Sequence, residues 1–215
     1  MNHSRLERLT LSTVYVLISE AGCCLPWQAV VEEALRGGAD VLQLREKHLP
    51  DNELLQRADW MADRCRDAGA LLILNDRPDL AAACNADGVH LGQEDVSAEM
   101  ARQQLQPDQL LGLSTHNLQQ LQAACRTSVS YLGVGPVFPS STKDFDSFAG
   151  LSFVREAAQF ADRPWFAIGG ISAVRLPELT EAGASRIAVS AEVIGSPDPA
   201  QAVRQLKVIL DGDRP

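Results

Sequence analysis

The sequence lacks any long apolar segment. No run in its 215 residues approaches the roughly 20 apolar residues that cross a bilayer, and residues 1–18 contain only a short apolar run that merges into a strand pattern. Neither a membrane span nor a targeting segment is indicated. We therefore expect a cytoplasmic protein that has no membrane partner.

Basic residues and cysteines are also scarce. The 19 Lys and Arg never form a long run and are outnumbered by 28 Asp and Glu, which gives a formal net charge of −9. A nucleic-acid partner is therefore not expected. The five cysteines are an odd number with no C-x-x-C spacing, so neither a disulfide framework nor a zinc site is indicated. We expect reduced thiols.

No linker or low-complexity stretch divides the chain, and its length is enough for one sizeable core but not for two well-developed domains. A Gly-rich nucleotide turn, typical of doubly wound open sheets, is missing as well. What the chain does contain is a cycle of about 20 to 30 residues, in which a short Leu-rich or β-branched run is followed by a helical pattern.

Eight such cycles predict an α/β fold. The strands are expected at 14–19, 41–44, 71–75, 88–91, 110–114, 131–134, 165–168 and 186–189, and most are apolar on both faces, as buried parallel strands are. The helices are expected at 27–36, 52–68, 78–84, 97–105, 117–125, 151–160, 174–182 and 200–210. Asp51 or Asn52 is placed to cap the second helix. The pattern favours one (β/α)₈ TIM barrel domain over residues 1–215.

Chemistry in such a barrel lies just past the strand ends. Gln43, Arg45 and Lys47 alternate along the second strand and its extension, so their side chains share one face. The two cations could grip a phosphate or diphosphate. The alternative is a strand end with ordinary surface charges.

Two aspartates follow neighbouring strands. Asp76 ends the third strand and Asp95 lies in the loop after the fourth, so the pair could share Mg²⁺, which prefers one or two carboxylates together with phosphate oxygens and water. Alternatively, Asp76 pairs with Arg77, and Asp95 caps the helix that begins near Ser97.

Hydroxyl and histidine side chains come next. Ser114 ends the fifth strand with Thr115 and His116, while His90 lies within the fourth strand. No H-x-x-x-H spacing supports a metal site, and a single histidine more often has a packing or capping role.

The later loops contain features suited to anions. The loop after the sixth strand presents Ser140, Thr142 and Lys143, which either form an anion clamp or belong to a flexible surface loop. Strand seven runs into Gly169 and Gly170, and strand eight ends at Ser190 and Ala191. Barrels often bind phosphate through backbone N–H groups at these two loops.

The segments QLREK (43–47), ND (75–76), GVHLGQED (88–95), GPVFPSSTK (135–143) and AIGGI (167–171) occur in this order. On these motifs the chain resembles the thiamine phosphate synthase family, over nearly its whole length as far as PDP at 197–199. The resemblance implies a (β/α)₈ barrel that joins a hydroxymethylpyrimidine diphosphate to a thiazole phosphate and releases pyrophosphate.

The resemblance also implies a set of site residues. The pyrimidine diphosphate would be bound by the QLREK segment, Asn75, Ser114 and Lys143, that is by Gln43, Leu44, Arg45, Glu46, Lys47, Asn75, Ser114 and Lys143. The thiazole phosphate would be bound by Ser140, Ser141, Thr142, Gly170, Ser190 and Ala191, the last three mainly through the backbone. Asp76 and Asp95 would hold the Mg²⁺ cofactor. Arg45, Lys47, Lys143 and Ser114 would be catalytic, with the cations stabilising the departing pyrophosphate, so that no side-chain nucleophile or strong base is needed.

Some positions depart from the family pattern. Arg175 stands where asparagine is common, and the serine near strand eight comes one place early, at Ser190. Two rival functions also remain: a thiazole tautomerase on the same scaffold, and a barrel that binds thiamine intermediates without turnover. The sequence leaves open whether the chain forms a homo-oligomer.

Overall fold

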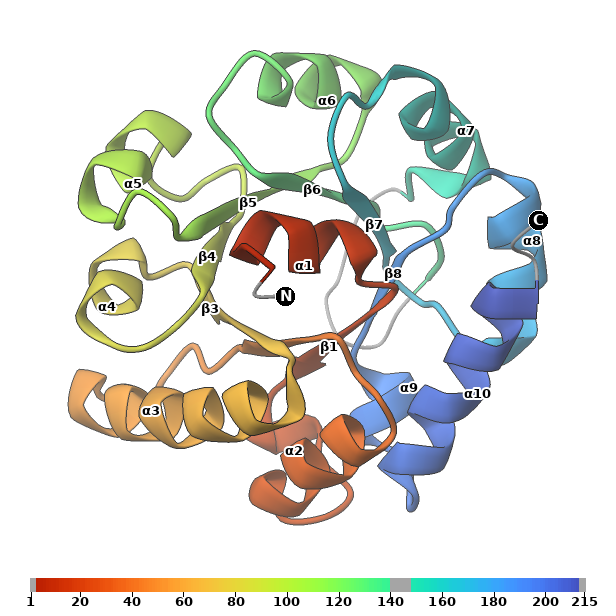
Figure 1. The fold of residues 1–215 in the computed structure, drawn as a ribbon. Coiled ribbons are helices and arrows are strands. Elements are labelled where there is room, and N and C mark those ends of the chain that lie inside the picture. The colour runs from red at the N-terminus through yellow and green to blue at the C-terminus, as the bar shows by residue number, and fades with distance from the viewer. Residues whose placement is uncertain (1–2, 140–147, 213–215) are drawn as a thin grey trace.

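The computed structural model describes residues 3–139 and 148–212. Eight parallel strands pair in chain order, and β1 also pairs with β8, so the sheet closes into a barrel (Figure 1). The strands are β1 (Val14–Ile18), β2 (Val41–Leu44), β3 (Leu71–Asn75), β4 (Gly88–Leu91), β5 (Leu110–Thr115), β6 (Tyr131–Val134), β7 (Trp165–Ile168) and β8 (Ile187–Val189). The predicted (β/α)₈ barrel is confirmed, and no predicted strand end is off by more than one residue.

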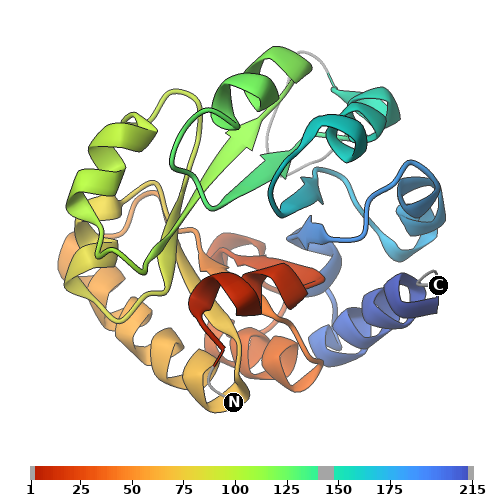
Figure 2. The ribbon, with the colours of Figure 1, turned by 45° about the horizontal axis from the view of Figure 1, so that its top comes forward.

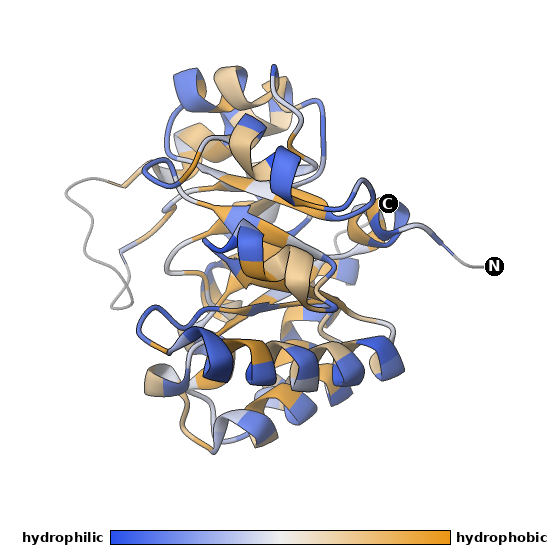
Figure 3. Cartoon of the chain, turned by 90° about the vertical axis from the view of Figure 1, so that its left-hand side faces the viewer, coloured by the Kyte–Doolittle hydropathy of each residue, from blue (hydrophilic) through white to orange (hydrophobic). Residues whose placement is uncertain are grey.

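Helices surround the strands as an outer ring (Figure 2). The eight predicted helices are present as α2 (Trp27–Arg36), α3 (Asp51–Ala68), α4 (Pro78–Ala83), α5 (Ala98–Gln104), α6 (Leu118–Ala124), α7 (Gly150–Phe160), α8 (Leu176–Glu181) and α10 (Pro199–Gly212). Hydrophobic and hydrophilic segments alternate along them, whereas the strands are mostly hydrophobic (Figure 3). This difference follows from burial, because each helix turns only one face to the barrel.

Three short elements were not predicted: α1 (Arg5–Leu11), η1 (Glu20–Gly22) and α9 (Ala191–Ile194), whereas η2 (Ala173–Arg175) overlaps the start of the helix predicted at 174–182. Helix α1 lies across the N-terminal mouth of the barrel (Figure 1) and inserts Leu9, which is fully buried against the barrel interior. Leu9 is the only buried residue of this helix. One buried position produces no apolar periodicity, so the sequence pattern could not reveal α1.

The predicted cap of α3 is wrong. The N-cap position is Pro50, and no side chain caps the helix. Asp51 lies inside the helix, and its carboxylate accepts a hydrogen bond of 2.6 Å from Arg77 instead. The other end follows expectation, because Gly69 closes α3 with a left-handed backbone, φ 73°. Within the described ranges, no helix has the length and apolar character that a bilayer crossing requires.

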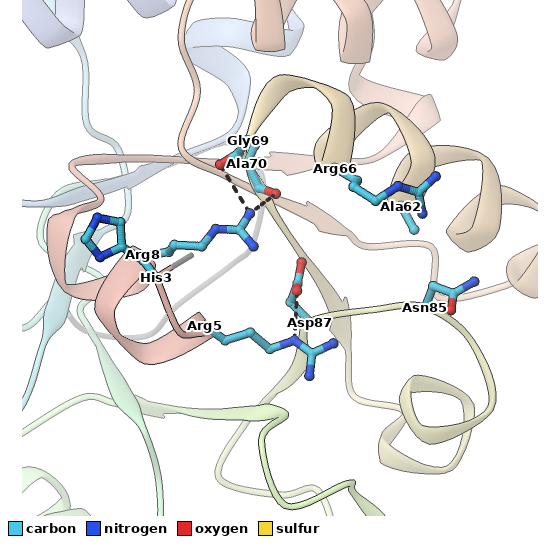
Figure 4. Close-up of a pocket in the computed structure, with 9 residues that line it drawn as sticks. All are labelled: His3, Arg5, Arg8, Ala62, Arg66, Gly69, Ala70, Asn85 and Asp87. Atoms are coloured by element: carbon cyan, nitrogen blue, oxygen red, sulfur yellow. Dashed lines mark hydrogen bonds and ion pairs between the residues drawn. The ribbon is translucent and has the colours of Figure 1, made fainter. Parts of the chain in front are cut away.

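A hollow of about 660 Å³ lies beside α1, at the N-terminal ends of the strands (Figure 4). Its basic side chains are already engaged. Arg5 pairs with Asp87 at 2.9 Å, and Arg8 donates hydrogen bonds to the carbonyls of Gly69 and Ala70. These contacts fasten α1 to the chain ahead of β3 and β4. Those predicted site residues that the structure describes lie toward the opposite end of the barrel.

Candidate active site

A chain of hydrogen bonds crosses the barrel interior below the strand ends. Gln43 Nε2 donates to Tyr15 Oη at 2.6 Å, and Tyr15 Oη lies 3.2 Å from Tyr131 Oη. Tyr131 Oη lies 3.1 Å from His90 Nδ1, and His90 Nε2 lies 2.9 Å from Ser114 Oγ. Two predicted substrate-binding residues, Gln43 and Ser114, are thus joined through three interior side chains.

The three titratable residues in this chain of hydrogen bonds, Tyr15, Tyr131 and His90, are neutral near pH 7. Burial raises the pKa of both Tyr15 and Tyr131, so the two phenols keep their protons. Burial also lowers the pKa of His90 to about 4, so its ring is an uncharged imidazole that has one donor and one acceptor nitrogen. His90 is therefore unsuited to be a strong general base.

The end of β2 gathers the predicted cations. Gln43 is 2% exposed and lies in the barrel interior, as its alternation with Arg45 and Lys47 predicts. Lys47 Nζ lies 3.8 Å from Asp76 Oδ2. Among the described residues, no hydrogen bond or ion pair engages the Arg45 side chain, whose backbone N–H donates to the Ile18 carbonyl. Its guanidinium is thus available to an anionic ligand.

Leu44, the last residue of β2, and Glu46, just past the strand, face away from the interior. The Leu44 side chain is buried in the core between the strands and the helices, which leaves only its backbone for a ligand. The Glu46 carboxylate accepts a 2.6 Å hydrogen bond from the Glu20 backbone N–H and lies 3.5 Å from Arg57 Nη1. Glu46 therefore ties the segment that presents Arg45 and Lys47 to η1 and α3.

Asp76 and Asp95 form the predicted carboxylate pair. Burial and the nearby Asp95 carboxylate raise the pKa of Asp76, whereas Lys47 acts in the opposite direction. Asp76 has a left-handed backbone, φ 62°, and its N–H donates to the His90 carbonyl at 2.9 Å. This hydrogen bond fixes the turn after β3 against β4.

The alternative roles of the two aspartates are not observed. Ser97 caps α5 by accepting a hydrogen bond from Met100 N, while Asp95 accepts one of 2.7 Å from Gly92 N. Arg77 pairs with Asp51 and Asp79 rather than with Asp76.

The carboxylate pair fits a hard divalent cation. The Asp95 carboxylate helps to raise the pKa of Asp76 because like charges repel, and a cation shared by the two carboxylates would relieve that repulsion. Within the described part of the chain, no group of three or more His, Cys, Asp or Glu gathers as a metal site. Asp76 and Asp95 thus suit an ion that takes its remaining ligands from substrate and water, as Mg²⁺ does.

Residues at the ends of β3 and β5 complete this side of the site. Asn75 is the neighbour of His90 in the strand register. The carbonyl of Ser114 accepts a 2.6 Å hydrogen bond from Gln93, which follows β4. His116 Nδ1 lies 2.5 Å from the Gly135 carbonyl, so this histidine joins two loops, in agreement with the packing role that we expected.

The loops after β7 and β8 are held by close backbone packing at Gly170 and by side chains that donate to backbone carbonyls. Gly170 has φ 61°, and a Cβ there would lie 2.9 Å from Phe138 Cβ. Arg175 donates to the Gly170 carbonyl at 2.9 Å and stacks over the Phe138 ring, so the departure from the family pattern supports this loop. Ser190 donates its hydroxyl to the Leu17 carbonyl at 3.1 Å, and Ala191 begins α9.

Four predicted ligand residues, Ser140, Ser141, Thr142 and Lys143, lie outside the described residues. Of the three interior residues that join Gln43 to Ser114, Tyr15 and Tyr131 were missed, and His90 was named but expected only to have a packing or capping role. Tyr15, Tyr131 and His90 are on β1, β6 and β4, and the only signal in the sequence was that polar side chains stand in three strands otherwise made of apolar residues and glycine. Their contact depends on barrel closure, which strand patterns alone do not reveal.

The fold and the polar strand ends define a (β/α)₈ barrel whose candidate site lies at the C-terminal ends of its strands. The family model of thiamine monophosphate synthase matches residues 14–193. A thiamine-phosphate synthase of Acidothermus cellulolyticus is 48% identical over 184 residues, which cover 85% of this chain and 87% of that protein. The chain belongs to the thiamine monophosphate synthase family.

Other relatives agree, although some are longer. A thiamine-phosphate synthase of Synechococcus sp. (strain WH7803) is 46% identical over 97% of this chain, which spans only 60% of that protein. A thiamine phosphate pyrophosphorylase from Pyrococcus furiosus superposes with a TM-score of 0.88 at 32% identity, covering 97% of this chain and all of that one. A 3-hexulose-6-phosphate synthase, with a TM-score of 0.67 at 15% identity, shares the fold alone.

Proposed function

We propose that the chain is a thiamine phosphate synthase. It would join 4-amino-2-methyl-5-(diphosphooxymethyl)pyrimidine to 4-methyl-5-(2-phosphooxyethyl)thiazole, forming thiamine phosphate and releasing pyrophosphate. Family membership supports this reaction. The observation that carries it is the pair of Asp76 and Asp95 beside Lys47. This arrangement suits a metal-assisted diphosphate site, which the rival thiazole tautomerase does not need.

Stabilising the leaving group is the main chemical task of this site. As the bond between the pyrimidine methylene and the diphosphate breaks, negative charge grows on the departing oxygens. Arg45 and Lys47 lie at the end of β2, where their charges can meet it, and Glu46 holds that segment in place. Lys143, which lies outside the described residues, is proposed to add a third cation.

Asp76 and Asp95 are the residues proposed to hold Mg²⁺. When bound, the ion would supply positive charge that neutralises the diphosphate oxygens. Lys47 near Asp76 keeps a second positive charge on the same side of the site. Both aspartates are therefore proposed as ligands rather than as proton donors or acceptors.

The pyrimidine is proposed to lie over Gln43, Asn75 and Ser114. The positive charge left on its methylene carbon is captured by the thiazole nitrogen, which is itself the nucleophile. This step needs no side-chain base. Consistently, both nitrogens of the neutral His90 ring lie within hydrogen-bond distance of a hydroxyl group.

The thiazole phosphate is proposed to bind at the loops after β6, β7 and β8. Gly170 and Ala191 would offer backbone N–H groups, and so would Ser190, whose hydroxyl already donates to Leu17. Ser140, Ser141 and Thr142 belong to the same proposal. A cytoplasmic location and the absence of nucleic-acid and membrane partners remain predictions, and whether the chain forms a homo-oligomer stays open.

The test is a coupled measurement of products. Purified protein is mixed with the pyrimidine diphosphate, the thiazole phosphate and Mg²⁺, and pyrophosphate and thiamine phosphate are quantified together. We expect equal amounts of both, loss of both with EDTA, and a large loss in Asp95→Ala, with Asp63→Ala as a matched surface control. Isomerisation of the thiazole without pyrophosphate would favour a tautomerase, and ligand binding without products would favour a sensor.

A further inference from the structure

The hydrogen-bond chain through the barrel interior has a direction. An amide nitrogen can only donate, so Tyr15 Oη is the acceptor from Gln43 Nε2. The single proton of Tyr15 must then be donated to Tyr131, since an unpaired buried hydroxyl costs free energy. Each link thereby determines the next one.

The same reasoning fixes the tautomer of His90. Because Tyr131 Oη already accepts from Tyr15, its proton goes to His90 Nδ1. A neutral imidazole that accepts at Nδ1 carries its proton on Nε2, and that proton is donated to Ser114 Oγ. The Ser114 hydroxyl keeps its own proton free for a ligand, while at the other end Gln43 keeps its carbonyl oxygen.

We infer that Tyr15, Tyr131 and His90 are positioning residues that fix the hydrogen-bond polarity at both ends of this chain. Ser114 is set as a donor and Gln43 as an acceptor toward the substrate. The matching ligand edge has an N–H donor and a ring-nitrogen acceptor, as an aminopyrimidine has. The ligand part of this inference rests on the proposed function, whereas the direction of the chain does not.

Gly112 and Gly133 leave space for the side chains of this hydrogen-bond chain, so the contacts are part of the packing of the barrel rather than accidental. A Cβ on Gly112 would overlap the Tyr131 phenol and the His90 ring. A Cβ on Gly133 would lie 3.3 Å from His90 Cε1. The contacts at Gly112 leave no room for a side chain, whereas at Gly133 the His90 ring would have to shift by only a few tenths of an ångström.

The direction is tested by nitrogen NMR of protein that contains ¹⁵N-labelled histidine, with His90→Asn used to assign the signals. We expect His90 as the Nε2–H tautomer in the wild type at neutral pH. In Tyr131→Phe the Nδ1 signal should shift, because its donor is gone, while in Ile73→Val, which alters the same interior without a polar group, it should not. An Nδ1–H tautomer in the wild type, or an unchanged spectrum in Tyr131→Phe, would overturn the inference.

The effect on substrate is tested by steady-state kinetics. Tyr131→Phe should raise KM for the pyrimidine diphosphate about tenfold, while kcat and KM for the thiazole phosphate change less than about twofold. His90→Gln should retain more activity than His90→Asn, since only the longer amide can reach Ser114 as a donor. An equal rise of both KM values, or identical Gln and Asn variants, would indicate mere packing. Absence of turnover in the wild type would refute the proposed function but leave the nitrogen spectra decisive for the direction.

Discussion

Gly112 on β5 faces Tyr131 on β6 in the strand register, and the phenol occupies the space that a side chain at residue 112 would need. The His90 ring fills the rest of that space. The interior of this barrel is therefore polar where two strands carry glycine, and apolar around Leu71, Ile73 and Phe166. Filling the space at residue 112 with a side chain should therefore destabilise the protein as much as removing the hydrogen-bonding groups of Tyr131 and His90.

Gly112→Ala should lower the free energy of unfolding by about 1 to 3 kcal/mol, because overpacking forces Tyr131 and His90 to shift. Gly133→Ala is the matched control, since its nearest neighbours are His90 atoms at 3.3 and 3.4 Å, and we expect a loss of less than about 1 kcal/mol. Urea denaturation measures both. Equal losses in the two variants would show that the space at residue 112 has no special role.

Asp76→Asn should raise the Mg²⁺ concentration that gives half-maximal activity on the order of tenfold or more. Asparagine also tolerates the left-handed backbone at this position, so the substitution removes charge without adding strain. The measurement is a Mg²⁺ titration of product formation. Asp79→Asn, which alters an ion pair of Asp79 with Arg77 and leaves the Asp76 carboxylate in place, should leave the titration unchanged. If both variants match the wild type, Asp76 is not a metal ligand.

The stability of the protein should depend on pH through His90. Its pKa is about 4 in the folded protein against 6.5 ordinarily, so below pH 6.5 the unfolded chain takes up a proton that the folded protein does not. The free energy of unfolding therefore falls as the pH drops from 6.5 toward 4, by on the order of 2 kcal/mol at pH 5.

The control compares how much the free energy of unfolding declines between pH 7 and pH 5 in two histidine variants. His90→Gln should lose that part of the decline, whereas His48→Gln, on the exposed segment after β2, should keep it. Denaturant titrations at pH 7 and pH 5 give the comparison. An equal decline in the wild type and in His90→Gln would show that another group causes it.

The barrel could be predicted from the sequence because its signal is local and repeated. Each strand is a short apolar run, and each helix follows it with a 3.6-residue period, so boundaries such as Val41–Leu44 and Trp27–Arg36 were predicted without error. Helix α1 was missed because one buried leucine makes no pattern. The cap of α3 was misplaced because the Asp51 carboxylate pairs with Arg77, which lies outside α3 in the turn before α4.

The candidate site was predictable only where its residues follow strand ends. Alternation along β2 placed Gln43 in the interior, but the partner of Glu46 is Arg57 on α3, which no local pattern connects to it. The path from Gln43 to Ser114 likewise depends on strands that meet only when the barrel closes. Contacts of this kind form only in the tertiary structure, so the sequence motifs identify Gln43 and Ser114 but not the residues that connect them.

Glu46→Gln tests whether the contacts of Glu46 with η1 and α3 are needed to hold the segment that carries Arg45 and Lys47. Glu46 and Arg57 are 13% and 17% exposed, so loss of the charge should cost about 1 to 2 kcal/mol of stability. It should also raise KM for the pyrimidine diphosphate several-fold, because the segment with Arg45 and Lys47 is less firmly held. Glu33→Gln removes a surface ion pair with Arg36 and should change neither quantity. An unaltered KM in Glu46→Gln would show that the contacts of Glu46 do not contribute to binding of the pyrimidine diphosphate.

Ser190 and Gly170 distinguish backbone from hydroxyl recognition of the thiazole phosphate. The Ser190 hydroxyl donates to Leu17, so Ser190→Ala should cost about 1 kcal/mol of stability yet change KM for the thiazole phosphate less than about twofold. Gly170→Ala should raise that KM strongly, because φ 61° and the contacts with Phe138 force the backbone N–H groups to move. Both variants are compared by steady-state kinetics with the pyrimidine diphosphate held at saturation. A large KM effect in Ser190→Ala would mean that the hydroxyl leaves Leu17 to bind the phosphate, and recognition would then not rest on the backbone alone.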